Sequence, residues 1–370
     1  MDLSEKITIL IPTYNRHAYL KRLLRYYLDN EIPLNILVAD SGTVPLDDEL
    51  VSIIASPRLS YLEFPSELTT QAKIRQALSK ITAEYTVICA DDDFIVPSAI
   101  KECIEFMEKN PDYSVALGRG CSHSLRKRKT GKIEFDWVPD HYGKSITTYG
   151  KPITFDSPSE RLKFHLSHYN TTFYGVHRTN TLRFIFEEAL EATSHGRLGE
   201  ILLTALTLIC GKMGKLPIFY ASREHNSSSV ERTLKILPYF HRPWSSFLAS
   251  DNCDAECQRA VACLAKNLQN QTDLDMDISI KTAEEALNGY LAPLRLRLFT
   301  QNRSYLRNLL REIVKKLHLR SLTLDSYRSN RRLRAAQREY ENLLGKSDSR
   351  FYENFNQVRE AIIKSEVHVI

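Results

Sequence analysis

The sequence lacks a hydrophobic run long enough to span a membrane. A spanning helix needs about 18 or more consecutive apolar residues, and the longest apolar stretch, residues 201–210, contains two threonines. Glycine and proline are scarce as well, with 13 and 14 among 370 residues, which excludes collagen-like and low-complexity chains. With 43% hydrophobic and 26% charged residues, the composition is that of a folded globular chain, long enough for two domains.

Cysteine is present, but in no pattern that indicates a disulfide framework. The seven cysteines are odd in number and include no C-x-x-C pair. The first residues, MDLSEKITILIP, lack the basic region and the cleavage site of a secretory signal peptide. We therefore expect the protein to work in the reducing cytoplasm.

Two glycine-rich nucleotide signatures are also missing. The Gly-Lys pairs at 211–212 and 345–346 have no glycine five residues upstream, so a Walker-type phosphate loop is excluded. No G-x-G-x-x-G follows the first apolar run, which disfavours a dinucleotide-binding domain of the usual kind.

Short apolar runs alternate with helical patterns in the first half of the chain. Strands are predicted at residues 7–11, 35–39, 61–64, 85–90 and 115–117, and helices at about 20–28, 71–79 and 98–110. A further apolar helix is predicted at 201–210, which puts Glu200 in its first turn. Apolar strands that alternate with helices predict a Rossmann-like α/β fold, a mostly parallel sheet flanked by helices.

Polar residues follow three of the predicted strands where each strand ends. Thr13 to Arg16 follow the first strand, Asp40 follows the second, and Asp91 to Asp93 follow the fourth. In a parallel sheet these ends meet at one edge, and ligands bind beyond that edge. The three positions therefore predict one ligand site.

The run of three aspartates indicates a bound cation. Adjacent carboxylates at the end of a buried strand repel one another unless a positive charge lies close by. Carboxylate oxygens suit Mg²⁺ or Mn²⁺, and such an ion usually binds substrate phosphates as well as one or two carboxylates. The run therefore favours metal-assisted chemistry on a diphosphate.

Three segments carry a family resemblance. ITILIPTYNRHAYLKRLLRYYL, LVADSG and VICADDDF resemble the start of a family 2 glycosyltransferase with the GT-A fold. The resemblance covers about residues 5–230. It implies a catalytic domain at 1–230 and an inverting, metal-dependent transfer of a sugar from a nucleotide sugar, UDP being the expected nucleotide.

The resemblance also implies roles for individual residues. Asp93 is expected to hold Mn²⁺ or Mg²⁺, and Arg75 in the segment 71–77 is expected to reach the nucleotide. The remaining residues expected to contact the nucleotide sugar are Pro12, Thr13, Tyr14, Asn15, Arg16, Asp40, Asp91 and Asp92.

Two later segments resemble further parts of the same family. LGEILL, with Glu200, is similar to the acidic segment near the acceptor, so Glu200 is the expected general base; Glu224 and Asp156 are the competing candidates. The segment YASREHNSSS resembles the end of the catalytic domain. In it, Arg223 is expected to pair with phosphate oxygens and His225 to be a further metal ligand.

The last third of the chain is helical and basic, and we expect it to form a separate region at 231–370. From Arg295 to Arg338 there are 13 Lys or Arg residues and two acids, a net charge of +11 that leaves −6 on the rest of the chain. One interpretation is a helical cap with a solvated basic face. The other is a peripheral contact with anionic lipid at the inner face of the membrane. No nucleic-acid-binding motif accompanies the charge.

Alternatives to glycosyl transfer stay open on the sequence alone. A sugar-phosphate nucleotidyltransferase shares the general topology, but it normally has a glycine-rich signature after the first strand, where this chain has Pro12 to Arg16 without glycine. A catalytically silent module that binds nucleotide sugar is the weaker alternative. For a transferase, the acceptor is a carbohydrate, a lipid-linked group or a protein.

Overall fold

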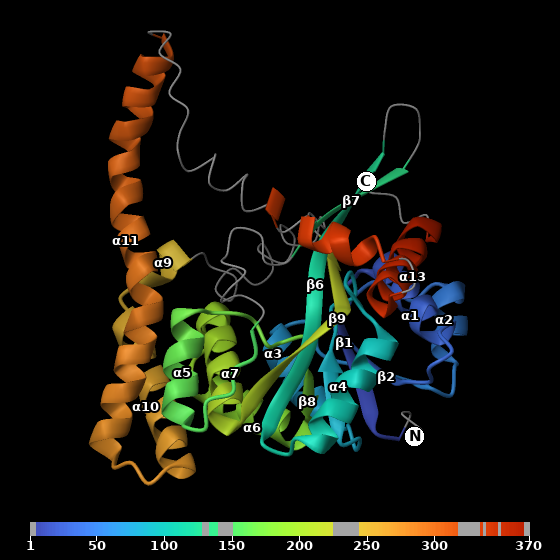
Figure 1. Ribbon diagram of the computed structural model, residues 1–370, viewed down its shortest axis with the longest axis horizontal. Coiled ribbons are helices and arrows are strands. Elements are labelled where there is room, and N and C mark those ends of the chain that lie inside the picture. The colour runs from blue at the N-terminus through green and yellow to red at the C-terminus, as the bar shows by residue number, and fades with distance from the viewer. Residues whose placement is uncertain are drawn as a thin grey trace.

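The computed structural model describes residues 5–127, 133–139, 151–224, 244–316, 334–335, 338–346 and 349–365. Its strands form one nine-stranded sheet in the order β3-β2-β1-β4-β8-β6-β9-β5, with β7 paired to β6 (Figure 1). The strands are β1 (Ile7–Thr13), β2 (Asn35–Asp40), β3 (Leu59–Glu63), β4 (Tyr85–Ile88), β5 (Phe94–Ile95), β6 (Tyr113–Lys127), β7 (Ile133–Pro139), β8 (Val176–Arg178) and β9 (Lys212–Glu224).

The predicted parallel sheet is confirmed in its central part. β3, β2, β1 and β4 are parallel neighbours. β8 is antiparallel to both β4 and β6, so β6 runs parallel to β4. Four of the five predicted strands match within a few residues, but the strand expected at 115–117 extends over Tyr113–Lys127. The carboxyl ends of β1, β2 and β4 therefore lie at one edge.

Helices cover both faces of the sheet. They are α1 (His17–Leu28), α2 (Asp48–Ile54), α3 (Thr70–Leu78), α4 (Pro97–Lys109), α5 (Pro158–Ser167), α6 (Thr179–Ala192), α7 (Gly196–Cys210), α9 (Trp244–Leu248), α10 (Cys253–Gln271), α11 (Met276–Lys316) and α13 (Arg350–Lys364). Alternate residues of β1 face opposite sides. Ile7, Ile9 and Ile11 lie in a core with α1, α4 and α13, whereas Leu10 lies in a second core with α3, α6 and α7.

The C-terminal helices pack against the part of the chain that resembles the catalytic domain. On α13, Phe351 and Phe355 contact Phe219 of β9 with ring centroids 5.5 and 5.3 Å apart. α10 packs against α6 and α7 in the second core. The division at residue 230 stays a prediction, since the same two cores include residues from both sides of it.

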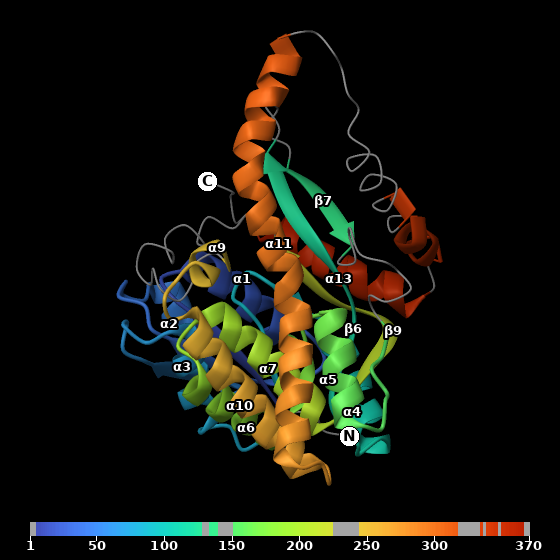
Figure 2. The same cartoon turned by 90° about the vertical axis from the view of Figure 1, so that its left-hand side faces the viewer.

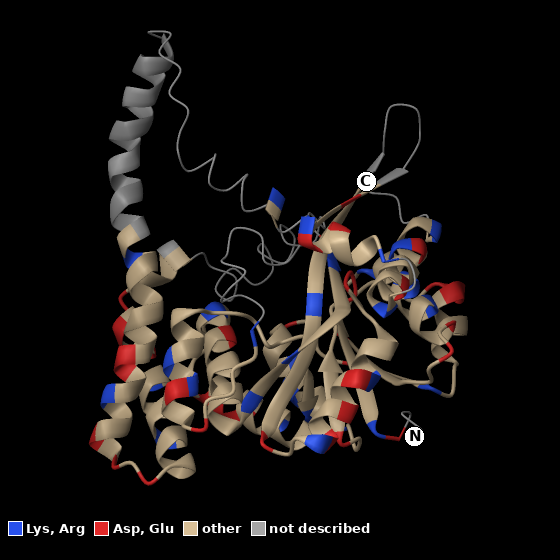
Figure 3. Ribbon diagram, in the orientation of Figure 1, with Lys and Arg blue, Asp and Glu red and all other residues tan. Residues whose placement is uncertain are grey.

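The long helix α11 extends far past α5 and α7 (Figures 1 and 2). Its charge is divided along its length. Residues 276–294 include three acids and one lysine, whereas residues 295–316 include seven Lys or Arg and one Glu. Figure 3 shows the acidic part at the end of α11 beside α10. Among the described helices, none is both long and apolar enough to cross a bilayer.

Candidate functional site

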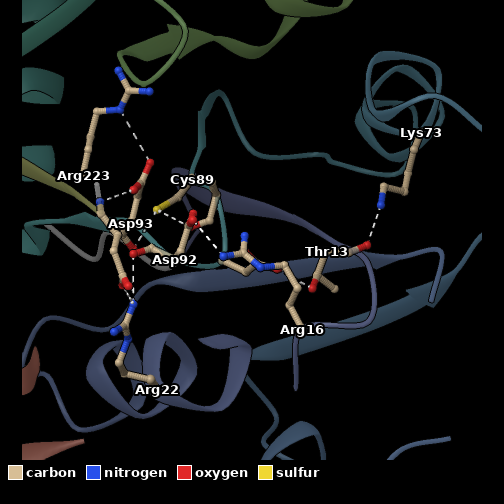
Figure 4. Close-up of polar contacts among 11 residues, drawn as sticks. Thr13, Arg16, Arg22, Lys73, Cys89, Asp92, Asp93 and Arg223 are labelled. Atoms are coloured by element: carbon tan, nitrogen blue, oxygen red, sulfur yellow. Dashed lines mark hydrogen bonds and ion pairs between the residues drawn. The ribbon is translucent and has the colours of Figure 1, made fainter. Parts of the chain in front are cut away.

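Three of the polar groups predicted to share an edge meet at the carboxyl ends of β1, β2 and β4. Thr13 lies opposite Asp40 in the register of β1 and β2, and Asp91 to Asp93 follow β4. Thr13, Asp40, Asp91 and Asp93 are each 2–4% exposed. Polar groups buried this deeply need partners, and Figure 4 shows those of the aspartates.

Arg16 binds two of the three aspartates. Its Nη1 donates to Asp91 Oδ1 at 2.5 Å, and its Nη2 donates to Asp92 Oδ2 at 2.8 Å. Thr13 Oγ1 donates to the other oxygen of Asp91 at 2.6 Å. The turn after β1 therefore holds the aspartate turn after β4 through charge-assisted hydrogen bonds.

Burial changes the protonation of this turn. It raises the pKa of Asp91 and of Asp93 to about 7, and the charge of Asp92 between them acts in the same direction. Arg16 opposes the shift at Asp91, and Arg223 opposes it at Asp93. A further positive charge here would favour the ionised carboxylates.

Asp93 connects the aspartate turn to the end of β9. Its Oδ1 accepts the backbone N–H of Glu224 at 2.8 Å, and the Tyr174 hydroxyl also hydrogen-bonds its carboxylate. Arg223 Nε lies 3.7 Å from Asp93 Oδ2, beyond hydrogen-bond distance, and its guanidinium stacks on the Tyr174 ring. The structure thus brings together Asp93 and Arg223, two of the predicted site residues. His225 lies outside the described residues.

The donor set at Asp93 fits a hard divalent cation. The carboxylate oxygens of Asp93 are hard ligands of the kind that such a cation prefers. Asp93 Oδ2 faces the half-exposed Arg223, whose Nε lies 3.7 Å away. Within the described ranges, no three His, Cys, Asp or Glu side chains are grouped as a complete metal site. Mg²⁺ is usually bound by one or two carboxylates together with phosphates and water, and Asp93 offers one such carboxylate.

Asp40 is fixed at the end of β2. Its Oδ1 accepts the backbone N–H of Gly42 at 2.6 Å, and its Oδ2 accepts the Tyr61 hydroxyl at 2.5 Å. Pro12 lies beside it in β1, opposite Ala39, and Tyr14 is partly buried in the turn that follows. The carboxylate therefore has one orientation at the edge where the nucleotide sugar is predicted to bind.

Asn15 joins the loops that follow β1 and β2. It has a left-handed backbone with φ 53°, which asparagine tolerates better than most residues. Its Oδ1 accepts the N–H groups of Thr43 and Val44 at 2.7 and 3.0 Å. A Cβ at Gly42 would lie 2.8 Å from that same oxygen, so the close approach requires glycine there. Asn15 therefore fixes the two loops at the predicted ligand site.

Lys73 is a site residue that the sequence reasoning missed. Its Nζ donates to the Thr13 carbonyl at 2.6 Å and to Ser41 Oγ at 2.8 Å, and burial lowers its pKa to about 8. Arg75, the predicted nucleotide contact on the same helix, is instead partly exposed, and its Nη1 lies 3.4 Å from Glu187 Oε1. The available signal was periodicity, because Lys73 shares the apolar face of α3 with Ala77.

Glu200 lies in the second turn of α7, not in the first. The helix begins at Gly196, and His195 caps it by accepting the N–H of Leu198 at its ring nitrogen. The expectation of a helix at 201–210 was therefore five residues short, because two glycines weaken the local helical pattern. Glu200 is exposed and accepts a hydrogen bond from Tyr169 at 3.1 Å.

The start of α7 lies at the same edge as the aspartates. Gln71 of α3 donates to the carbonyl of Gly196 at 3.1 Å, and Lys73, half a turn further, contacts Thr13. The described contacts of Glu200 itself are to aromatic residues and not to Asp91 or Asp93.

The two competing candidates for the base have other partners. Glu224 is buried and pairs with Arg22 at 2.7 Å; although burial acts to raise its pKa, His123 and Arg22 together lower it. Asp156 pairs with Lys212 at 2.6 Å and is 96% exposed. Lys212 begins β9, at the opposite edge of the sheet from the aspartates.

The fold and the polar edge define a GT-A-like α/β protein. The family model described as Glycosyl transferase family 2 matches residues 8–187, which assigns this segment of the chain to that family. Among solved structures, the chain is similar to S. aureus TarS 1-349, with a TM-score of 0.50 and 14% identity over 78% of this chain and 72% of that one. The same protein in complex with UDP-GlcNAc gives the same score and identity, over 78% and 73%. No match was found among curated proteins.

Proposed function

We propose that this chain is a metal-dependent glycosyltransferase that transfers a sugar from a UDP-linked donor to an acceptor hydroxyl with inversion. The observation that carries the proposal is the buried aspartate turn, surrounded by Arg16, Lys73 and Arg223 at the carboxyl edge of the sheet. The complex of the structurally similar TarS with UDP-GlcNAc supports the choice of donor class.

The donor would lie along this edge. Asp40 and the loop Pro12 to Arg16 would hold the base, as their neighbouring positions suggest. Asp91 or Asp92 would contact the ribose, and Arg223 would pair with phosphate oxygens through its planar guanidinium. Lys73 adds a buried positive charge under the loop.

The cation would be held by Asp93 and would screen the charge that develops on the diphosphate as the glycosidic bond breaks. The Glu224 N–H and the Tyr174 hydroxyl hydrogen-bond the Asp93 carboxylate and so orient it. His225 is proposed as a further ligand.

Glu200 is the proposed general base. Its side chain is exposed, and the helix that carries it begins at the edge that holds the aspartates, so an acceptor hydroxyl could reach it. An inverting transfer needs one base, on the face of the sugar opposite the diphosphate. The acceptor would be a carbohydrate, a lipid-linked group or a protein.

The proposal for the whole chain is a catalytic domain at 1–230 and a helical region at 231–370. The basic segment 295–338 would bring the enzyme to the anionic inner face of the membrane, in the cytoplasm.

A donor-hydrolysis panel tests the proposed function. The protein is incubated with Mn²⁺ and a set of nucleotide sugars, and released nucleoside diphosphate is measured. We expect release from one or more UDP-sugars, and loss of release when the metal is chelated. No release from any donor, with pyrophosphate formed from a sugar phosphate and a nucleoside triphosphate, would instead indicate a nucleotidyltransferase.

A further inference from the structure

Arg22 links two parts of the site that are far apart in the sequence. Its side chain is 1% exposed, and its Nη2 donates to the carbonyl of Asp92 at 3.0 Å and to Glu224 Oε2 at 2.7 Å. The backbone N–H of Glu224 then donates to Asp93 Oδ1 at 2.8 Å. Because Asp92 and Asp93 are consecutive, these contacts close a ring of interactions (Figure 4).

The Glu224 carboxylate is held from a second side as well. Glu224 lies opposite His123 in the register of β9 and β6, and His123 Nε2 is 3.7 Å from its Oε2. His123 is itself fixed, since its Nδ1 is 2.8 Å from Ser222 Oγ and its ring stacks on Phe135. Glu224 therefore has a defined orientation.

This arrangement is a poor one for stability alone. Within the described part of the chain, Arg22 Nε and Nη1 are buried without an acceptor, and the guanidinium lies over the rings of Tyr19 and Phe94. Unpaired buried N–H groups cost free energy, and an apolar residue of similar volume would often be at least as stable as a buried ion pair. The hydrogen bond from Arg22 Nη2 to the Asp92 carbonyl indicates that the arginine also orients the aspartate turn.

The ring determines how the Asp93 carboxylate is oriented. With Oδ1 engaged by the Glu224 N–H, Oδ2 is directed toward the half-exposed Arg223. We propose that Arg22 and Glu224 are positioning residues that hold Asp93 in the orientation needed to bind a divalent cation with a nucleoside diphosphate. This inference rests on the proposed function, and it excludes Glu224 as the general base.

The test measures Mn²⁺ and UDP binding by calorimetry, without any turnover. Partners that orient a metal ligand typically contribute about 10–100-fold to metal affinity. We expect Glu224→Gln and Arg22→Met each to weaken Mn²⁺–UDP binding by about tenfold or more. The double variant should lose little more than either single variant, because both changes open the same ring. Arg22→Lys should recover part of the affinity.

Arg161→Met is the matched control. Arg161 is also a buried arginine, but it donates to the carbonyls of Leu208 and Ile209 at the far end of α7. The Arg161→Met substitution should lower the melting temperature and leave the Mn²⁺–UDP affinity of the folded protein unchanged.

The outcomes separate the two proposals. If the wild type binds Mn²⁺–UDP and folded Glu224→Gln binds it equally well, the positioning role is refuted while the proposed function stands. If the wild type binds no Mn²⁺–UDP, both fail. If Arg161→Met loses affinity as strongly as Arg22→Met, the effect is general destabilisation and the positioning role is again refuted.

Discussion

At the scale of single residues, Asp93 is the position whose removal should be most informative. Asp93→Asn keeps the size of the side chain and its hydrogen bond from the Glu224 N–H, but it removes the charge. We expect metal-dependent release of nucleoside diphosphate to be abolished, with the circular dichroism spectrum and melting temperature essentially retained. Full activity in this variant would contradict the assignment of Asp93 to the metal.

The raised carboxyl pKa values predict how cation binding depends on pH. Asp91 and Asp93 titrate at about 7 in the folded protein but at about 4 in an unfolded chain. Between these values the folded state holds more protons, so their contribution to stability is largest at low pH and is lost as the pH rises through 7.

A cation must displace those protons. Mn²⁺ affinity should therefore rise about tenfold per pH unit below 7, if one proton is released, and level off above it. Lys73, with a pKa of about 8, loses its charge above that value, so UDP binding should weaken there. Titrations of Mn²⁺ and of UDP at pH values from 5.5 to 9 would check both; an affinity independent of pH would speak against buried, protonated aspartates.

A substitution of Glu200 tests whether this residue is the general base. Glu200→Gln retains an acceptor for the Tyr169 hydroxyl and removes the basic group. Donor binding should be unchanged, and transfer to the acceptor should fall about 10²–10⁴-fold. The measurement is acceptor-dependent turnover beside UDP-sugar affinity. Turnover within a few-fold of the wild type would rule Glu200 out.

At the scale of elements, α3 offers two basic residues for the nucleotide, and the structure distinguishes them. Lys73 is buried against the loops after β1 and β2, whereas Arg75 lies at the surface near Glu187. We expect Lys73→Met to weaken UDP binding at least tenfold, because it removes a buried donor that holds both loops. Arg75→Ala should change it little, since exposed ion pairs contribute little energy. The measurement is the UDP affinity of both variants by calorimetry. A larger loss of affinity in Arg75→Ala than in Lys73→Met would support Arg75 as the nucleotide contact.

At the scale of the whole molecule, the charge is unevenly distributed. The segment 295–338 has a net charge of +11, and the rest of the chain −6. Near an anionic leaflet, each basic residue contributes roughly 1 kcal/mol within a Debye length. The protein should therefore sediment with vesicles containing anionic lipid at low salt and be released at high salt. If it stays in the supernatant at low salt, the basic charge serves internal pairing or solvation instead.

Much of the central sheet and its polar edge could be predicted from the sequence. Apolar runs such as Ile7 to Ile11 are buried on both faces of a parallel sheet, and that requirement is visible in a few consecutive residues. Thr13 and Asp40 are the last residues of their strands and Asp91 follows β4, and strand ends at a common edge bring these together. Each of these signals is local, which is why the sequence alone determined this part of the protein.

The tertiary structure alone decided the partners of these residues. Arg22 and Glu224 are 202 positions apart, and no spacing rule connects a basic residue on a helix with an acid at the end of a distant strand. Lys73 contacts the loops after β1 and β2, and Arg75 does not, because Lys73 lies on the buried face of α3. Such contacts are set by how helices and strands pack, and packing depends on many residues at once, so a local pattern does not contain them.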